Sequence, residues 1–322
     1  MPQTPVTILP LSQIKERLKT ADLIPLIESG FVAYSDKQAV VPPVGELIFE
    51  DPPGETHIKY GYIKEQKYAA VKIASGFYNN PKLGIKASQG VILLFSQQTG
   101  ELRCVLLDEG LLTDIRTAIA SMITLKYLAP KKVDKIGIIG TGIMAKLQLA
   151  YLHQVSDCKE IVVWGRTPKN VLAYQDYFKD SPYTVHIAKD IASLAAQCQV
   201  IVTTTFSKEA LLQKAHIQRG THITALGSDT AEKIELSPKI LQMADIVVSD
   251  SLAQSQSRGE VFQARKANCL NTEKLVELGT LIKNPALGRQ DADQITVADL
   301  TGVAVQDIMI ATAIFDAVTQ AK

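Results

Sequence analysis

Apolar and polar positions follow two different periods along this chain. Between residues 31 and 107, short apolar runs with polar residues at alternate positions are separated by Pro and Gly, a pattern typical of antiparallel strands. Between residues 135 and about 250, short apolar runs alternate with segments of helical spacing, which indicates a doubly wound parallel sheet. The chain is therefore predicted to contain a mainly antiparallel β part followed by an α/β part.

The same pattern places the individual elements. Helices are expected at 12–19, 20–30, 112–128 and 302–320, with Gly30 as the C-cap of the second. The last helix is so apolar that we expect it to return to the first domain. Residues 251–300 mix helix and loop. Strands are expected at 31–34, 39–41, 46–49, 57–63, 68–73, 90–95 and 102–107, and near residues 136, 161, 184, 200, 222 and 246.

The most informative stretch follows the apolar run Ile136–Ile139. It reads Gly140-Thr141-Gly142-Ile143-Met144-Ala145 and continues with helical spacing, and a second apolar run, Glu160–Trp164, follows one helix later. Gly140 would allow a sharp turn, and Gly142 would let a pyrophosphate approach the backbone at the positive end of the helix. An ordinary glycine turn is the alternative, but the βαβ context favours a dinucleotide site at residues 140–144.

The residues after the second apolar run indicate which dinucleotide binds. A site specific for NAD usually has Asp or Glu there to accept hydrogen bonds from the ribose hydroxyls. This chain has no acid at that position and instead clusters Arg166, Thr167 and Lys169. Arginine can hold a 2′-phosphate, so NADP(H) is predicted as the preferred cofactor, with NAD(H) possible. A solvated basic loop is the alternative interpretation.

Composition limits the function classes. With 322 residues the chain exceeds the usual size of one hydrophobic core, so two domains are expected. The formal net charge is only +1 and no basic stripe is visible, which favours a small-molecule partner over nucleic acid.

No apolar run reaches the ~18 residues needed to cross a bilayer, and no export signal is evident, so a cytoplasmic protein without a membrane partner is expected. No metal-ligand spacing appears. The cysteines, predicted to be buried thiols, are Cys104, Cys158, Cys198 and Cys269.

Four polar residues lie where the local pattern does not require them. Lys72 interrupts an apolar run, although it could face solvent on an alternating strand. Arg116, in the first turn of the 112–128 helix, offers a fork suited to a carboxylate, but an exposed arginine is equally compatible. Asp229 follows the apolar run 222–226 at the carboxyl end of a predicted strand, where ligands bind, or it could be the N-cap of a helix near 232–235. Lys233 lies four residues on and could pair with Asp229 or hold a substrate.

These features together resemble the ornithine cyclodeaminase and mu-crystallin family. The resemblance runs in order over residues 30–315. The motifs that carry it are Val71-Lys72-Ile73-Ala74-Ser75-Gly76 with Asn80-Pro81, Leu112-Thr113-Asp114-Ile115-Arg116-Thr117-Ala118, Gly140-Thr141-Gly142, residues 220–229 ending in Gly227-Ser228-Asp229, Gly259-Glu260, and residues 299–307 from Asp299 to Asp307.

The resemblance implies a fold, an assembly and a chemistry. The implied fold is α/β, with a Rossmann doubly wound parallel sheet inserted in an α+β substrate-binding and dimerisation domain of a homodimer. The domains are then 1–130 plus 303–322, and 131–302 for the dinucleotide. By the family's motifs, Lys72 and Arg116 would hold the substrate carboxylate, with Lys72 also polarising the imine, and Asp229 would be the acid/base. Lys233 would assist in substrate binding, and Thr113 is assigned to the cofactor.

One departure from the family narrows the expected reaction. Ornithine cyclodeaminases have an arginine and a glutamate upstream of the catalytic lysine to grip the substrate, whereas this chain shows no acid at the glutamate position, and Lys59 would repel a δ-ammonium. We therefore predict an NADPH-preferring reductase of a small cyclic α-imino acid, with Δ1-pyrroline-2-carboxylate to L-proline as the best substrate pair. The alternatives are ornithine cyclodeamination, opine-type condensation and a non-catalytic NADPH-binding protein like mu-crystallin. Mu-crystallins lack the acid at the Asp229 position.

Overall fold

The computed structural model describes residues 5–77 and 79–319. The chain divides into two compact units, Met1–Arg116 with Val303–Lys322, and Thr117–Gly302, so that the second is inserted into the first. Helix α3 (Leu111–Leu128) contains the first of the two division points. Among the described residues, no helix combines the length and apolarity required to cross a membrane.

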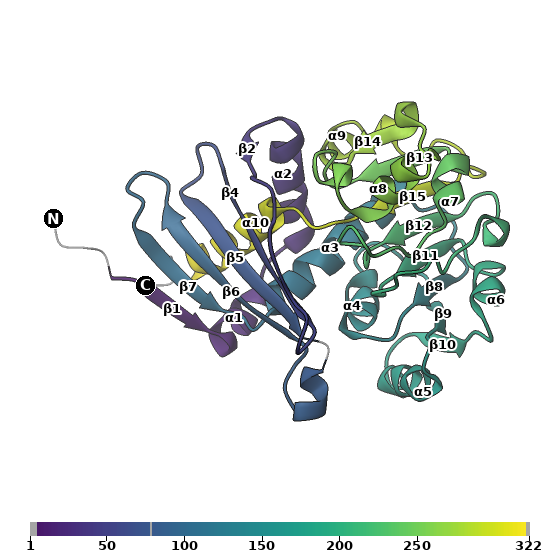
Figure 1. Cartoon of the computed structure of the whole chain (residues 1–322), viewed down its shortest axis with the longest axis horizontal. Helices are drawn as coiled ribbons and strands as arrows, with labels where there is room; N and C mark the ends of the chain where they lie inside the picture. The colour runs from purple at the N-terminus through teal and green to yellow at the C-terminus, as the bar shows by residue number, and fades with distance from the viewer. Residues whose placement is uncertain (1–4, 78, 320–322) are drawn as a thin grey trace. The chain divides into compact units, whose positions relative to one another are not determined.

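The first unit is built on a seven-stranded, mainly antiparallel sheet (Figure 1). The strand order is β1-β7-β6-β5-β4-β2, with β3 also paired to β4, and β1 runs parallel to β7. Side chains alternate between the two faces, as the twofold period predicts. The strands are β1 Thr7–Pro10, β2 Ala39–Val40, β3 Gly45–Phe49, β4 Gly54–Ile63, β5 Tyr68–Phe77, β6 Ser88–Ser96 and β7 Leu102–Leu107.

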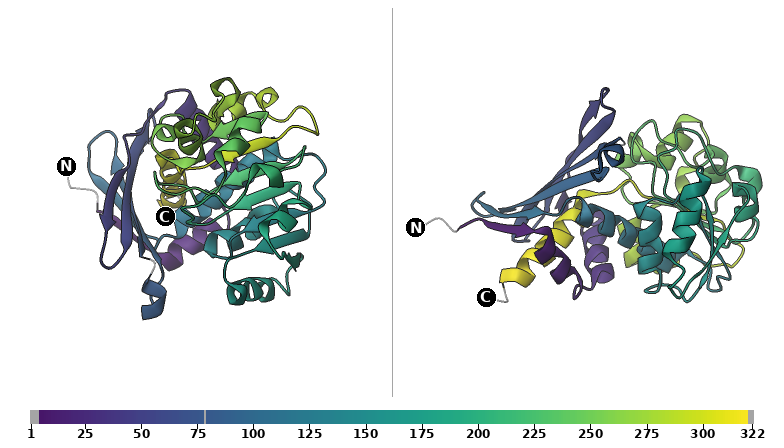
Figure 2. Two further views of the ribbon diagram at one scale, coloured as in Figure 1. Left: turned by 45° about the vertical axis from the view of Figure 1, so that its right-hand side comes forward. Right: turned by 90° about the horizontal axis from the view of Figure 1, so that it is seen from below.

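Helices α1 (Leu11–Leu18), α2 (Leu23–Ser35) and α10 (Ala304–Thr319) complete the unit, together with the short η1 (Asn80–Leu83). In the right-hand view of Figure 2, α2 and α10 lie on one side of the sheet. Helix α10 contacts α2, β4 and β5, so the expected return of the last helix to the first part of the chain is confirmed.

The strand predicted at 31–34 is wrong, and so is the C-cap at Gly30. Helix α2 continues to Ser35 because Ile27 and Phe31 form one buried stripe at helical spacing. Gly30 lies inside this helix, where a Cβ would come within 2.7 Å of Met309 Cγ. The glycine therefore lets α10 approach closely, and this contact between distant segments is invisible in the local pattern. Strand β1 was not expected either.

The second unit is an eight-stranded, fully parallel sheet of the Rossmann type, in the order β10-β9-β8-β11-β12-β15-β13-β14. All six strands expected between residues 135 and 250 are confirmed; β14 and β15 were missed. Strand β15 is the last in sequence, yet it is inserted between β12 and β13. The strands are β8 Ile136–Ile139, β9 Glu160–Trp164, β10 Thr184–Ile187, β11 Val200–Thr203, β12 His222–Ala225, β13 Ile246–Ser249, β14 Leu275–Glu277 and β15 Thr296–Asp299.

Short helices connect these strands. They are α4 Ile143–Leu152, α5 Pro168–Tyr177, α6 Ile191–Ala195, η2 Lys214–His216, α7 Pro238–Met243, η3 Gln254–Gln256, α8 Gly259–Lys266, η4 Thr272–Lys274, α9 Leu278–Lys283 and η5 Pro285–Leu287.

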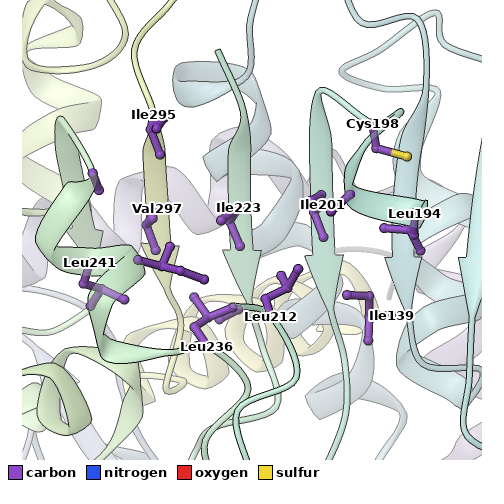
Figure 3. Packing of buried hydrophobic residues seen from close by; sticks show 14 of the residues in the cluster. Ile139, Leu194, Cys198, Ile201, Leu212, Ile223, Leu236, Leu241, Ile295 and Val297 are labelled. Carbon is purple, nitrogen blue, oxygen red and sulfur yellow. The ribbon is translucent and has the colours of Figure 1, made fainter. Parts of the chain in front are cut away.

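An apolar core covers one face of the parallel sheet (Figure 3). Ile201, Ile223 and Val297 point from neighbouring strands toward Leu212 and Leu236, which lie in the loops that follow. All of these side chains are buried. The central strands are buried over their whole length because a parallel sheet in this fold is covered on both faces.

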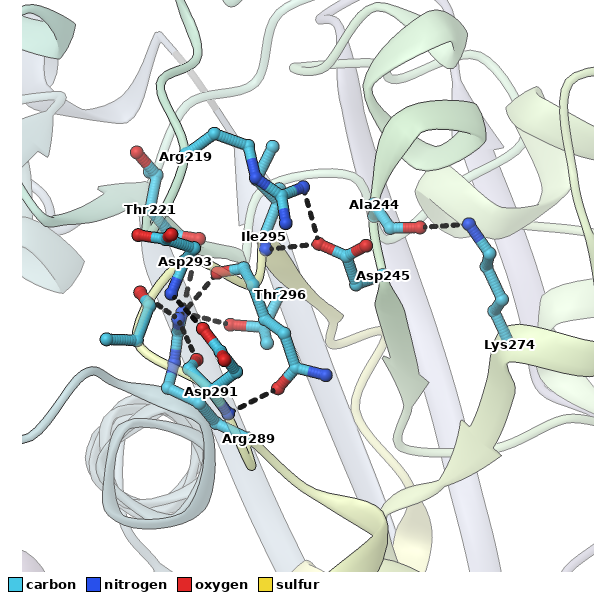
Figure 4. A network of polar contacts seen from close by, with 12 residues as sticks. Arg219, Thr221, Ala244, Asp245, Lys274, Arg289, Asp291, Asp293, Ile295 and Thr296 are labelled. Carbon is cyan, nitrogen blue, oxygen red and sulfur yellow. Dashed lines mark hydrogen bonds and ion pairs between the residues drawn. The ribbon is translucent and has the colours of Figure 1, made fainter.

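A polar network closes the sheet at its other end (Figure 4). Arg289 donates from Nε to Leu128 O (2.7 Å) and from Nη2 to Thr296 Oγ1 (3.0 Å). Its Nη1 also reaches the backbone oxygens of Ala292 and Gln294. The network lies at the amino ends of β12 and β15, opposite the edge where ligands of parallel sheets bind. We therefore interpret it as structural.

Candidate functional site

The glycine turn has the shape that a bound dinucleotide requires. Gly140 has φ +119°, and a Cβ there would collide with Thr204 Oγ1, so the turn itself needs glycine. Gly142 is the N-cap of α4, and a Cβ built on it would meet no heavy atom of the described residues within 4 Å. The protein therefore leaves the space above Gly142 open, which fits the close approach of a pyrophosphate.

The position of this turn within the sheet agrees with that interpretation. β8 pairs with β9 on one side and with β11 on the other, so Gly140 follows the strand at which the order reverses. Ligands of open α/β sheets bind outside the carboxyl ends of strands at this point. Ile143 and Met144 form the first turn of α4, and Ile143 is 53% exposed.

The tip of β9 lies next to the glycine turn. A Cβ on Gly165 would come within 2.9 Å of Thr141 Cγ2, so the two loops are in contact. Arg166, Thr167 and Lys169 follow and are exposed. Thr167 is the N-cap of α5, with Pro168 at its first position. No acid lies between residues 165 and 170.

Asp229 and Lys233 form an ion pair after β12. Lys233 Nζ lies 2.7 Å from Asp229 Oδ1; the lysine side chain is buried, whereas that of Asp229 is 32% exposed. No helix forms near residues 232–235, so the alternative role of Asp229 as an N-cap there is wrong. The loop is held instead by Ser228 Oγ, which donates to Lys233 O at 2.6 Å, and by Arg258 Nη1, which donates to Asp229 O at 3.3 Å.

Glu235 organises this edge of the sheet and was missed by sequence reasoning. Its buried carboxylate accepts hydrogen bonds from Thr203 Oγ1 (2.7 Å), from the N–H (2.6 Å) and Oγ1 (2.7 Å) of Thr205, and from Gly227 N (2.8 Å). It thereby ties the loop after β11 to the loop that carries Asp229. Burial raises the pKa of Glu235 although these hydrogen bonds oppose the shift.

Other buried acids support Glu235. Glu260 accepts hydrogen bonds from Glu235 N (2.7 Å) and Leu236 N (3.2 Å). Burial, followed by the charges of Asp299 and Glu235, raises the pKa of Glu260 well above its ordinary value. Asp299, at the end of β15, accepts from Val261 N at 2.8 Å, and burial raises its pKa to about 7. Within the described ranges, no group of His, Cys, Asp or Glu side chains is placed to hold a metal ion.

In the first unit, Lys72 and Arg116 meet at one carboxylate, that of Asp307. Lys72, on β5, places Nζ 3.2 Å from Asp307 Oδ1 and 3.0 Å from Oδ2. Arg116, in α3, places Nε 3.1 Å from Asp307 Oδ1. Gln306 completes the cluster: its Oε1 accepts from Arg116 Nη1 (3.3 Å) and its Nε2 donates to Arg116 O (3.0 Å). Solvent exposure of either cation is thus excluded.

Burial governs the ionisation of this cluster. Lys72 is 1% exposed, and burial, helped by the positive charge of Arg116, lowers its pKa to about 8 although Asp307 opposes the shift. For Asp307, burial alone would raise the pKa, but the charges of Lys72, Arg116 and Lys59 outweigh it and hold the pKa below its ordinary value. The cluster therefore combines the carboxylate of Asp307, which stays ionised, with Lys72, which can lose its proton near pH 8.

The structure thus brings some predicted residues together in each unit. Lys72 joins Arg116 through Asp307, Asp229 joins Lys233, and the glycine turn joins the tip of β9. Thr113 lies half-buried in the first turn of α3, and no described contact tests its assignment to the cofactor. Asp307 belongs to a motif that carries the family resemblance, but an acid in the first turn of a helix is also what the helix dipole favours. No local sequence signal therefore showed that Asp307 is the partner of Lys72 and Arg116 rather than an ordinary acid in the first turn of a helix.

Comparison with solved structures agrees with this architecture. An archaeal alanine dehydrogenase, solved as a dimer with bound NAD, matches 98% of this chain and 97% of its own with a TM-score of 0.89 at 28% identity. The iminosuccinate reductase of Paracoccus denitrificans, solved with NAD+, matches 98% of this chain and 97% of its own with a TM-score of 0.87 at 28% identity.

Comparison of sequences gives relatives of similar length. The chain is 35% identical to an uncharacterised cyclodeaminase, y4tK, of Sinorhizobium fredii over 91% of this chain and 90% of the relative. It is 31% identical to the iminosuccinate reductase over 90% and 89%. It is 27% identical to a Δ1-pyrroline-2-carboxylate reductase of Bacillus cereus over 88% and 87%. The model of the ornithine cyclodeaminase/mu-crystallin family matches residues 6–322. This match covers the parallel sheet, the glycine turn and the buried residues Lys72 and Arg116, and the chain therefore belongs to the ornithine cyclodeaminase/mu-crystallin family.

Proposed function

We propose that this protein is an NAD(P)H-dependent reductase of a small α-imino acid, with Δ1-pyrroline-2-carboxylate to L-proline as the first substrate pair to test. The observation that carries the proposal is the buried pair Lys72 and Arg116, which suits an anionic substrate, in a chain whose relatives include two imino-acid reductases. When bound, the reduced nicotinamide supplies the hydride for the C=N carbon.

Lys72 and Arg116 bind the carboxylate of the imino acid. The guanidinium of Arg116 offers two donors in one plane, and Asp307 with Gln306 fixes its orientation. A carboxylate that joins this cluster is desolvated, so its bonds to the two cations are stronger than at a surface. Lys72, with its lowered pKa, also polarises the imine.

Asp229 is proposed as the acid that supplies the proton. Its carboxyl is partly exposed and in contact with the buried ammonium of Lys233, which fixes its position. In the proposed reaction Asp229, or a water molecule that it orients, delivers the proton to the imine nitrogen as the carbon is reduced. Glu235 holds the loop that carries Asp229 and acts as a positioning residue.

The activity test uses the whole protein with NADPH and Δ1-pyrroline-2-carboxylate. We expect oxidation of NADPH with formation of one proline per cofactor, and a loss of about 100-fold or more in kcat for Asp229→Asn. Reduction that is unchanged in Asp229→Asn would reject the assigned role of that residue. Failure to reduce any imino acid would reject the proposed function, and ammonia release from ornithine would favour cyclodeamination in its place.

Arg166 is proposed to select NADPH. The exposed Arg166, Thr167 and Lys169, with no nearby acid, suit a 2′-phosphate, although the solved relatives described above contain NAD or NAD+. Arg166→Ala should raise the KM for NADPH about tenfold or more and leave that for NADH within about twofold. Lys179→Ala, at an exposed lysine after α5, is the matched control. An equal effect on both cofactors would reject the selection of NADPH by Arg166.

We also propose a homodimer. The sheet of the first unit carries helices on one face, and its other face is rich in apolar side chains, among which Ile8, Leu107, Tyr60 and Tyr62 are exposed. Such a face is typical of an interface, and the archaeal relative is a dimer. Light scattering should give twice the chain mass of 35.1 kDa. The double variant Ile8→Glu/Leu107→Glu should give one chain mass, and a dimer that survives it would reject this face as the interface.

A further inference from the structure

Phe206 follows β11, in a loop that lies between the glycine turn and Asp229. Within the parallel sheet, β11 pairs with β8 on one side and with β12 on the other. The glycine turn follows β8, and the loop that carries Asp229 follows β12. Because the carboxyl ends of parallel strands lie at one edge of the sheet, these three loops are neighbours. A dinucleotide that extends from the glycine turn toward Asp229 must therefore pass the loop of Phe206.

This loop is fixed directly before Phe206. The N–H and Oγ1 of Thr204 both donate to Ile139 O, at 2.9 and 3.1 Å, at the end of the strand that leads into the glycine turn. The N–H of Thr205 donates to Glu235 Oε1 at 2.6 Å, and its Oγ1 donates to the same oxygen at 2.7 Å. The backbone that presents Phe206 is thus tied to both neighbouring loops.

The ring of Phe206 is also held beside Asp229. Its centroid lies 5.0 Å from Lys233 Nζ, which is within the range of a cation–π contact. The same ammonium lies 2.7 Å from Asp229 Oδ1. Directly after the ring, Ser207 O accepts a hydrogen bond from Ile234 N at 2.8 Å. Phe206 is nevertheless 65% exposed, so a well-anchored loop presents a flat apolar ring at this edge of the sheet.

The proposed reaction brings the nicotinamide ring to the same place. The C=N bond receives a hydride from that ring and a proton from Asp229, so the ring and the acid approach the two ends of one bond. We propose that Phe206 binds the nicotinamide ring of the cofactor by aromatic stacking. The inference rests on the cofactor of the proposed function, and it adds a residue that holds the reacting end of that cofactor.

The test separates the nicotinamide ring from the rest of the cofactor. Calorimetry measures the Kd of NADPH and that of 2′-phospho-ADP-ribose, which lacks only the nicotinamide ring. In Phe206→Ala the Kd of NADPH should rise about tenfold, because stacking of a base on an aromatic side chain contributes about this factor. The Kd of 2′-phospho-ADP-ribose should stay within about twofold. NADH and ADP-ribose form the equivalent pair without the 2′-phosphate.

Two more variants distinguish stacking from loss of bulk. Phe206→Tyr keeps the flat ring and should keep the Kd of NADPH within about twofold. Phe206→Leu keeps an apolar side chain but loses the flat face, so its Kd should lie between those of the natural protein and Phe206→Ala. A Phe206→Leu protein that binds NADPH as tightly as the natural protein would overturn the role of stacking.

Tyr177 provides the matched control. It is 62% exposed, and Lys146 Nζ lies 4.1 Å from its ring centroid, so it is also an exposed ring beside a lysine. It is the last residue of α5, which follows β9 and runs back toward the amino ends of the strands. Tyr177→Ala should therefore leave the Kd of both ligands unchanged.

The outcomes separate this inference from the proposed function. Unchanged NADPH binding in Phe206→Ala would overturn the inference. Equal weakening of NADPH and 2′-phospho-ADP-ribose would overturn it too, because Phe206 would then act on the glycine turn rather than on the nicotinamide ring. Selective loss of NADPH binding in a protein that reduces no imino acid would support the inference and reject the reductase function. A natural protein that binds neither NADPH nor NADH would reject both.

Discussion

At the scale of single residues, Asp307 contributes more to the stability of the first unit than its sequence context indicates. It is the carboxylate that contacts both Lys72 and Arg116, and all three side chains are buried. Breaking a buried ion pair by removing one partner leaves an uncompensated charge in a poorly solvated place. Asp307 is therefore expected to matter for folding as well as for the orientation of Arg116.

Asp307→Asn should lower the free energy of unfolding by about 3 kcal/mol, because two buried cations then lose their counter-charge. Denaturant titration measures this. Asp316→Asn, on the same helix but in a partly exposed pair with Lys67 at 3.8 Å, is the matched control and should cost less than about 1 kcal/mol. Equal losses in the two variants would show that the buried cluster is not held by Asp307.

The lowered pKa of Lys72 predicts a pH dependence of anion binding. The ammonium form, which binds a carboxylate, is present below pH 8 and is lost as the pH rises through the pKa of about 8. The Kd of pyrrole-2-carboxylate, a planar carboxylate probe, should thus rise up to tenfold per pH unit above that point. Lys72→Arg, which keeps its charge, should flatten the profile. A natural protein whose Kd is constant up to pH 10 would contradict this ionisation.

His222 predicts a second pH effect, on stability. Its ring is buried in β12, where Nδ1 lies 2.9 Å from Thr296 Oγ1 and Nε2 lies 2.9 Å from Thr224 Oγ1. Burial, helped by the charge of Arg289, lowers its pKa to about 3. The unfolded chain takes up a proton below its pKa of 6.5 while the folded ring does not, so stability falls as the pH falls.

Between pH 7 and pH 5 this term should remove about 2 kcal/mol from the free energy of unfolding. Urea titrations at both pH values measure the loss, which should shrink by that amount in His222→Gln. His153→Gln, at an exposed histidine, should leave the loss as it is in the natural protein. If the natural protein and His222→Gln lose the same free energy, the buried ring is protonated in the folded state.

At the scale of elements, the two glycines of the turn between β8 and α4 are expected to have different roles. Gly140 is needed for folding of the turn, and Gly142 is needed for binding of the cofactor. Gly140→Ala should destabilise the protein by at least about 1 kcal/mol, because φ is positive and Thr204 fills the space of a Cβ. Gly142→Ala should cost less than about 1 kcal/mol, since φ is −79° and no described atom is in the way. The same change should weaken NADPH binding at least tenfold. Thermal unfolding and cofactor titration of both variants check the pair, and normal NADPH binding by Gly142→Ala would place the pyrophosphate elsewhere.

Elements were predictable where local sequence decides them. The strand, glycine turn and helix at residues 136–152 follow from an apolar run, two glycines and helical spacing, and the structure has them where expected. Phe31–Ser35 was not predictable in this way, because β-favouring residues continue α2 under the contact with α10. Strand β15 was missed because its position between β12 and β13 depends on partners more than 45 residues away in sequence.

At the scale of the whole molecule, the pattern alone indicated the two kinds of sheet and the return of the last helix. The candidate site was predictable only as separate residues. Lys72 and Arg116 could be selected by residue type and motif, but their common partner Asp307 lies 235 residues after Lys72 and 191 residues after Arg116 along the chain. The supporting role of Glu235 arises from loops that meet only in the folded sheet. Such long-range pairs have no signature in a single sequence.

The late position of β15 and α10 along the chain has a consequence for biosynthesis. β15 lies inside the parallel sheet, between β12 and β13, and α10 is the apolar helix that contacts α2, β4 and β5. Neither unit can close until β15 and α10 have left the exit tunnel of the ribosome. Until then the nascent protein exposes the unpaired edges of β12 and β13, and such edges can form strand pairs with other chains. Demand for chaperones during translation should accordingly persist until both elements have emerged from the ribosome.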